Sequence, residues 1–281
     1  KSPEAAGIAR YGNYEVNLFS GLPNISIPLY NIKVGGLTVP ISISYHAGGI
    51  KVSDMASWIG LGWSLSASGS INRRVMGRPD EVSNGYLNGG PVIRDVSNFN
   101  NSVAGDLEYL ANIVKGIVDV EPDIYSYNFP GGGGKFFFKK DNQAVLMPRG
   151  NVGVSRTQLT STQNFDLTDA SGNGYKFDVM EMAYAGNGIS TNDAASTWWL
   201  SRMVSSNKQD TISFNYSPRT GSGSTDYTLG ETYFIEDDLV NAVNPPIYTF
   251  REGFYGTSIS WYTTNWQLIS EIRFKDGKVV F

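Results

Sequence analysis

The chain has 281 residues with no cysteine, one histidine and a formal net charge of −4, from 22 basic and 26 acidic side chains. The missing cysteines exclude disulfides, thiolate metal sites and cysteine nucleophiles, and a single histidine excludes metal sites that need two imidazoles. The mildly acidic balance argues against nucleic-acid binding, and no apolar run is long enough for a membrane-spanning helix.

The composition indicates a β-rich protein. Charged residues make up 17% of the chain, whereas aromatic residues reach 13% and glycines number 32. An average globular protein has about 25% charged residues. Few charges combined with many glycine and aromatic residues are typical of an extracytoplasmic β protein, and not of a helical or disordered one. We therefore predict a secreted or cell-surface location.

The first predicted element is a hairpin. Residues 37–45 alternate strictly between apolar or aromatic side chains and small, polar or proline residues, which is the period of a half-buried strand. Residues 25–29 repeat this alternation, and Gly35-Gly36 supplies the permissive backbone for a turn between the two runs. Pro40 donates no ladder hydrogen bond, so it belongs at an edge or beside a bulge.

A glycine- and tryptophan-rich segment, residues 58–65, follows this hairpin. Gly60 and Gly62 permit sharp turns or a close approach of strands, and we expect Trp58 and Trp63 to be buried beside them. The functional alternative for this segment is an aromatic platform for a sugar.

One helix is predicted, over residues 106–118. Its apolar side chains recur at helical spacing, so we expect it to pack on a sheet face. These side chains are Leu107, Leu110, Ile113, Val114 and Ile117. Two polar stretches, residues 83–102 and 217–226, are predicted to be long loops.

Two further hairpins and a weak repeat complete the β pattern. Residues 125–138 and 165–177 each read as strand, turn and strand, and the glycine run before Lys135 is a hairpin loop because Phe136 stands where a phosphate loop needs Ser or Thr. Strand–turn–strand units at 198–214 and 266–281 align Trp198 with Trp266. Such a recurring unit suggests a stackable array.

Several motifs together resemble a known family. They are Ser2-Pro3-Glu4-Ala5-Ala6, the segments 23–29 and 40–46, Trp58-Ile59-Gly60-Leu61-Gly62-Trp63-Ser64-Leu65 and Gly77-Arg78-Pro79-Asp80-Glu81. In this order they resemble the opening of bacterial Rhs/YD-repeat proteins and are similar to the N-terminal region of the B component of insecticidal toxin complexes. The resemblance is dense over residues 2–81 and returns in the later hairpins.

The resemblance implies a large secreted or surface-attached protein in which YD repeats wind β-hairpins into a hollow shell. In that family the shell can enclose a C-terminal toxin. This chain lacks the long repeat array and the C-terminal core motif, so any toxic or self-cleaving activity would lie outside these 281 residues. The partner implied is the downstream YD-repeat shell of the same polypeptide.

The turn at residues 169–174 is a weak metal candidate. Asp169, Ser171 and Asn173 offer oxygen donors at the first, third and fifth positions of a calcium loop. Position twelve is Met180, which cannot ligate calcium, and the same residue types suit a tight turn. His46 lies on the polar parity of its strand without a nucleophile or orienting acid nearby in sequence, so we predict a surface or structural role.

A late aromatic cluster is the best predicted binding candidate. Tyr255, Trp261 and Tyr262 crowd a polar region in which exposed rings would suit stacking on a sugar. Trp266 shares the repeat register of Trp198, and we expect it to point into the core.

These observations favour a mainly β protein built from antiparallel hairpins, as a sandwich or an open curved shell, with one short helix and a single domain over residues 1–281. The predicted function is that of a non-enzymatic structural head that initiates or caps a β-shell and contacts a surface glycan or protein. A carbohydrate-binding adhesin-like module is the alternative, and a glycoside hydrolase comes third, since 26 acidic residues always allow some carboxylate pair. No cofactor, catalytic residue or nucleic-acid partner is predicted.

Overall fold

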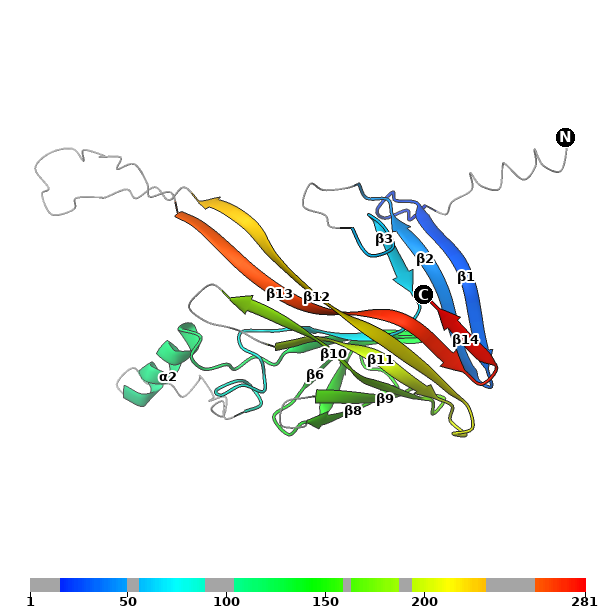
Figure 1. The fold of residues 1–281 in the computed structure, drawn as a ribbon. Coiled ribbons are helices and arrows are strands. Elements are labelled where there is room, and N and C mark those ends of the chain that lie inside the picture. The colour runs from blue at the N-terminus through cyan, green and yellow to red at the C-terminus, as the bar shows by residue number, and fades with distance from the viewer. Residues whose placement is uncertain (1–15, 50–55, 89–103, 159–162, 187–193, 231–255) are drawn as a thin grey trace, which may run out of the picture. The chain divides into compact units, whose positions relative to one another are not determined.

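The computed structural model describes residues 16–49, 56–88, 104–158, 163–186, 194–230 and 256–281 (Figure 1). The fold is mainly β and antiparallel with one short α-helix among the described residues, which confirms the predicted fold class. No helix in these ranges has the length and hydrophobicity needed to cross a membrane.

The predicted hairpin forms most of a three-stranded sheet. Its strands are β1 (Asn24–Val34), β2 (Leu37–His46) and β3 (Trp63–Ser66). Val34 pairs with Leu37 across the Gly35-Gly36 turn, and Gly35 has a positive φ of 55°. A Cβ atom at Gly35 would collide with the side chain of Asp210, which together with the positive φ favours glycine there.

A β-bulge keeps the apolar residues of β1 on one face. Ile27 pairs with Ile43 and Pro28 with Ser42, but the next pair is Tyr30 with Ile41, which leaves Leu29 as the extra residue. Without this shift, the later residues of β1 would present their apolar side chains to the opposite face. Pro40 lies in the part of β2 that is not paired with β3, as its missing donor requires.

The remaining strands form a sheet of eleven strands. They are β4 (Ser70–Arg74), β5 (Ile124–Phe129), β6 (Gly132–Phe138), β7 (Ala144–Met147), β8 (Gly153–Gln158), β9 (Gln163–Thr168), β10 (Gly174–Gly186), β11 (Ala194–Val204), β12 (Thr211–Gly230), β13 (Gly256–Phe274) and β14 (Gly277–Val280). Their order is β7-β6-β5-β4-β11-β12-β13-β10-β9-β8, with β14 paired to β13 and an additional β11–β10 pairing. The hairpins predicted at 125–138 and 165–177 are β5–β6 and β9–β10.

One predicted loop and the predicted packing of the helix are wrong. Residues 217–226, predicted as a loop, lie within β12, because pairing with long neighbouring strands satisfies the backbone whatever the side chains favour. The helix α2 spans Ala104–Val114, ending earlier than predicted, and Gly116 follows with a φ of 67°. Leu107 and Val114 are 48% and 86% exposed, so the predicted packing of this stripe on a sheet face does not occur.

The core of the large sheet is aromatic. The ring of Trp198 packs edge-on against Phe165 at 4.9 Å between ring centroids, and Tyr125 stacks on Phe136 at 5.1 Å. All four side chains are fully buried, and the indole of Trp198 donates a hydrogen bond to the carbonyl of Gln163 at 2.6 Å. Such ring pairs add stability beyond the area they bury.

The chain divides into two compact units. The first comprises residues 1–180, 196–217 and 267–281, and so includes the three-stranded sheet, α2 and β4–β9. The second comprises residues 181–195 and 218–266. Within the second unit, β10 pairs with β13 from Ala183 opposite Thr264 to Gly186 opposite Trp261.

Candidate functional site

The predicted aromatic site falls at the edge of the described structure. Trp261 and Tyr262 lie in β13, where their backbones pair with Gly186 and Ala185, but their side chains lie outside the description. Tyr255 lies outside the described residues altogether. Trp266 is 40% exposed, so the expectation that it points into the core is wrong. Matching sequence register did not fix which way its side chain points.

The turn of the metal candidate is held together by its own hydrogen bonds. Oδ1 of Asp169 accepts from the backbones of Ser171 and Asn173, and Oδ2 accepts from Asn173 Nδ2 and the Tyr175 hydroxyl, all at 2.8–2.9 Å. Partial burial raises the pKa of Asp169, but these hydrogen bonds outweigh it and leave the pKa below its ordinary value. In the described ranges, no group of three or more His, Cys, Asp or Glu side chains is placed to hold a metal ion.

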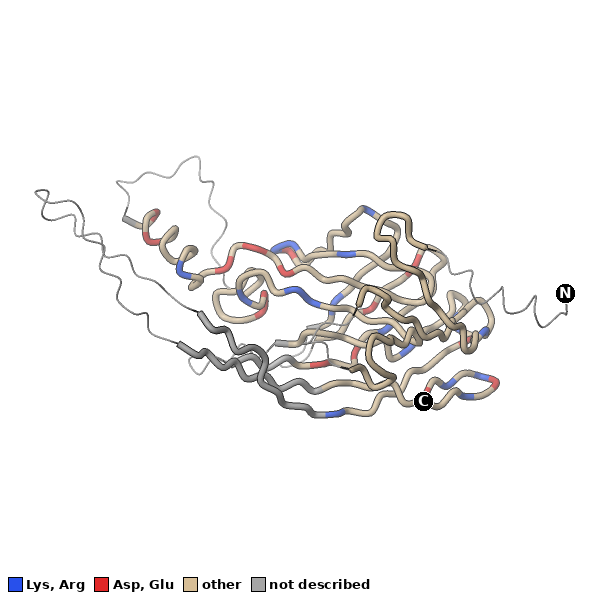
Figure 2. The backbone as a smooth tube through the Cα atoms, turned by 90° about the horizontal axis from the view of Figure 1, so that it is seen from above, with Lys and Arg blue, Asp and Glu red and all other residues tan. Residues whose placement is uncertain are grey.

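The three-stranded sheet has two contrasting faces. Register places Asn24 beside His46, Ser26 beside Ser44 and Ser64, and Ser42 beside Ser66 on one face. Ile25, Ile27, Ile43, Tyr45, Trp63 and Leu65 share the other, which we call the apolar face. Lys33 is the one Lys, Arg, Asp or Glu within residues 16–49, and residues 56–66 have none; Figure 2 marks the charged positions along the backbone.

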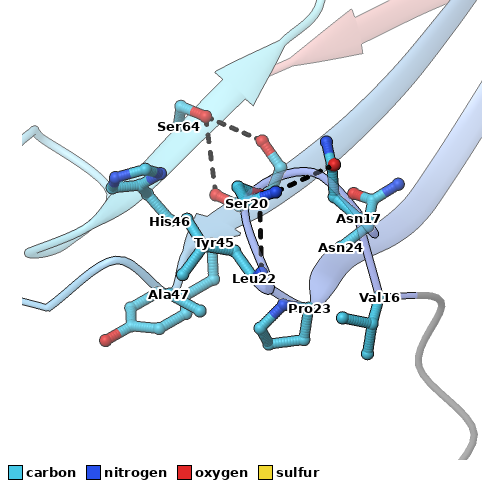
Figure 3. A pocket seen from close by; sticks show the side chains of 11 residues that line it. Val16, Asn17, Ser20, Leu22, Pro23, Asn24, Tyr45, His46, Ala47 and Ser64 are labelled. Carbon is cyan, nitrogen blue, oxygen red and sulfur yellow. Dashed lines mark hydrogen bonds between the residues drawn. The ribbon is translucent and has the colours of Figure 1, made fainter.

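An open pocket of about 560 Å³ lies at the end of the polar face (Figure 3). It is lined by Val16, Asn17, Ser20, Leu22, Pro23, Asn24, Ser44, Tyr45, His46, Ala47 and Ser64. None of these residues is an Asp, Glu, Lys or Arg. Among the described residues His46 therefore has no carboxylate partner in the lining, and the hydroxyl and amide groups of the pocket can form hydrogen bonds with an uncharged ligand.

Local hydrogen bonds fix the wall of this pocket. Oδ1 of Asn17 accepts from the backbones of Phe19 at 2.9 Å and Ser20 at 3.3 Å, which closes the loop before β1. On the sheet, the hydroxyls of Ser44 and Ser64 lie 2.8 Å apart. The pocket thus combines one loop with all three strands of the sheet, a combination that sequence spacing alone does not bring together.

Beside the pocket, the same end of the sheet carries exposed apolar side chains. Leu18 and Phe19 are 98% and 101% exposed, and Trp58 is 48% exposed, which contradicts its predicted burial. The glycines of this segment do turn as predicted, with φ values of 128° at Gly60 and 76° at Gly62. A Cβ atom at Gly62 would lie 2.8 Å from the Tyr45 ring, so this turn requires glycine.

A second cluster, missed by the sequence analysis, is buried next to the aromatic core. Arg73 on β4 has a fully buried side chain that donates to both carboxylate oxygens of Glu81 at 2.7–2.8 Å. Asp80 and Asp123 are 0% exposed. A glycosidase needs carboxyl groups that reach a substrate, so this pair does not supply one. The signal available in the sequence was the dense run of charges at 78–81.

Comparison with known proteins adds one distant likeness. No family model matches the chain, and no curated protein matches it. The N-terminal domain of the effector protein SpvB from Salmonella typhimurium strain LT2 aligns with a TM-score of 0.35 and 11% identity, over 92% of this chain and 65% of that chain. The fold and pocket thus define a mainly β protein of antiparallel hairpins with an uncharged polar pocket.

Proposed function

We propose that this chain is the non-enzymatic structural head of a larger secreted or surface-exposed Rhs/YD-repeat protein, in which it starts or caps a β-shell. The observation that carries the proposal is the partly uncovered apolar face of the three-stranded sheet. Ile27 and Tyr30 are 44% and 55% exposed although they follow the strand period of a buried face. Exposed apolar patches of this kind mark surfaces that another element covers.

The edge of the last hairpin supports the same proposal. Among the described residues, β14 pairs only with β13, and the backbone of Phe281 donates to the carbonyl of Ser270 at 3.0 Å. Hydrogen-bonded pairs alternate along an antiparallel ladder, so the N–H of Val279 faces β13 whereas that of Val280 points away from it. A following strand would pair with this outer edge.

The native reading frame tests the family assignment. We expect tandem strand–turn–strand repeats after Phe281 and, beyond them, a variable C-terminal region. A native polypeptide that continues without such repeats would overturn the proposal.

The free edge is tested on the chain itself. Val280→Pro removes an outward N–H, so we expect it to lower concentration-dependent self-association in analytical ultracentrifugation with little change in melting temperature. Val279→Pro is the matched control, because it removes an N–H that faces β13 and should lower the melting temperature instead. Equal self-association of wild type and Val280→Pro would argue against pairing of a further strand with the outer edge of β14.

A second candidate function, binding of a neutral glycan, is favoured by the uncharged hydroxyl, amide and imidazole lining of the pocket in Figure 3. A glycan array of wild type, Asn24→Ala and Trp261→Ala tests it. Binding lost only in Asn24→Ala would place the sugar in the pocket, and binding lost only in Trp261→Ala would place it at the late aromatic cluster. No binding by the wild type would remove this candidate.

A further inference from the structure

The buried charges around Arg73 are unequal in number. The Arg73 guanidinium donates to Glu81 and lies 3.6 Å from Oδ2 of Asp123. Asp80 and Asp123 exchange hydrogen bonds across the site, since each backbone N–H donates to the other residue's carboxyl group at 3.0–3.1 Å. Three carboxyl groups therefore share one arginine, and of the three only Glu81 reaches solvent, with 25% of its side chain exposed.

The two aspartates differ in how well a negative charge would be stabilised. Oδ1 of Asp123 accepts from the backbone of Met76 at 2.9 Å and its Oδ2 accepts from the backbone of Asp80, while Arg73 lies close. Asp80 accepts only from the backbone of Asp123, and among the described residues its Oδ2 has no hydrogen-bond partner. A buried carboxylate with a single donor is more costly than a neutral carboxylic acid.

We infer that Asp80 keeps its proton in the folded protein in mildly acidic solution, where an exposed aspartate is ionised, so that the attachment of residues 76–88 to β4 and to Asp123 before β5 stabilises the fold most in acid and weakens as the pH rises to neutrality and beyond. The bonds to Arg73 and Asp123 attach the segment, and the segment is also folded on itself, since the carbonyl of Asp80 accepts from the backbones of Leu87 and Asn88 at 2.9–3.1 Å. A Cβ atom at Gly85 would lie 2.7 Å from the same carbonyl, so the segment is tightly packed around Asp80.

The other charged groups near Asp80 also disfavour its ionised form. Glu81 and Asp119 are further carboxylates near it, and Asp119 is held by the backbone of Arg78 at 3.2 Å. The guanidinium of Arg78 is turned to the carbonyl of Gly116. From β5, Tyr125 contributes a buried hydroxyl without a partner in the described structure.

On the remaining side, Tyr86 packs under Lys140, whose ammonium group lies 4.4 Å from the ring and donates to the Tyr86 carbonyl. Asp141 adds a further negative charge near Tyr86. Arg73 is thus the cation that directly faces the carboxyl cluster, and it is already bonded to Glu81.

The direction of the pH effect follows from linkage. Burial, and next the charge of Asp123, raise the pKa of Asp80 to about 7, and burial raises the pKa of Asp123 to about 6 despite its donors. An acid whose pKa is higher in the folded than in the unfolded chain adds stability below its unfolded pKa, and this contribution is lost as the pH rises through the folded pKa. The loss falls between about pH 4 and pH 8.

The test compares wild type with Asp80→Asn, which has the shape of the neutral acid at every pH. We expect the melting temperature of wild type to fall by about 5–10 °C between pH 5 and pH 8 relative to that of Asp80→Asn. Asp123→Asn is the matched control, because its amide would face a backbone N–H and should lower the melting temperature at all pH values. If the melting temperature of Asp80→Asn depends on pH as that of wild type does, the inference is wrong.

A measurement on the wild type keeps the inference testable if a variant does not fold. Carbon-13 NMR of the aspartate carboxyl groups should show one signal that titrates near neutral pH, while the amide protons of Met76, Asp80 and Asp123 lose exchange protection over the same range, after correction for intrinsic rates. Aspartate signals that all titrate in the usual acidic range would overturn it.

Discussion

The two ends of the β1–β2 hairpin share one sequence pattern but differ in what covers them. Near the turn, Ile32 and Val39 are 1% and 0% exposed. Toward the other end of the same strands and on the same face, Ile27 is 44% exposed, and Tyr30, midway along β1, is 55% exposed although its partner Ile41 is buried. Alternation therefore determines which face a side chain joins, whereas burial depends on whether another element lies over that face.

The two ends of the hairpin also have different roles. The covered end is a folding element, because its apolar side chains belong to the core. The uncovered end carries the pocket and the exposed side chains of Leu18, Phe19 and Trp58, so it has the features of an interaction surface. Substitutions at matched positions of the two classes should accordingly differ in their effect on stability.

The largest difference is expected between two tryptophans. Trp198→Ala should destabilise the protein by about 3–5 kcal/mol, because it empties a fully buried site within the aromatic core. Trp266→Ala should cost less than half as much, since 40% of that residue is exposed. Urea denaturation of both variants measures this difference. Equal losses of unfolding free energy would show that the exposure of Trp266 does not reduce its contribution to stability.

A matched pair within β1 sharpens the comparison. Ile32→Ala should lower the free energy of unfolding by about 2–5 kcal/mol, whereas Ile27→Ala should lower it by about 1 kcal/mol or less. Both residues are isoleucines on the same strand and the same face, so the difference in β-propensity between Ile and Ala contributes equally to the two substitutions. A large loss for Ile27→Ala would mean that the apolar face is covered within this chain, and would weaken the proposal of a structural head.

The turn at Asp169 borders the covered end of the hairpin, because a pocket lined by Gly36, Leu37 and Asn173 also includes Asp169. Asp169→Ala removes the acceptor of four hydrogen bonds and should cost about 1–2 kcal/mol in thermal denaturation. Since the folded pKa of Asp169 lies below its ordinary value, its contribution is present above that value and is lost as the pH falls through the folded pKa. Stabilisation of wild type by added calcium, absent in Asp169→Ala, would instead favour the metal hypothesis.

The smallest effect is expected at the uncovered end. His46 is exposed, and no described Asp or Glu lines its pocket, so His46→Gln should change the free energy of unfolding by less than about 0.5 kcal/mol. Any hydrolytic activity of the chain should also remain. Loss of a measurable activity with an unchanged melting temperature would favour an enzyme over a structural module.

Local residue patterns were sufficient for the hairpins but not for the helix or the long strands. The turn at Gly35-Gly36 and the alternation around it predicted β1 and β2 correctly, because turn chemistry and strand period are local properties. The stripe of α2 predicted a helix correctly but its packing wrongly, since the stripe shows only which side is apolar. Residues 217–226 form part of β12 because neighbouring strands supply their backbone partners.

The sequence by itself determined the strand period, the hairpin turns and the scarcity of charge on residues 16–49, because these depend on neighbouring residues alone. Only the tertiary structure decided that Trp198 is buried and Trp266 is not, and that Asp80 meets Asp123 from a position 43 residues away. The pocket depends on the same kind of information, since it joins a loop to three strands. Burial and long-range contact are properties of how strands pair and stack, and no local pattern specifies them.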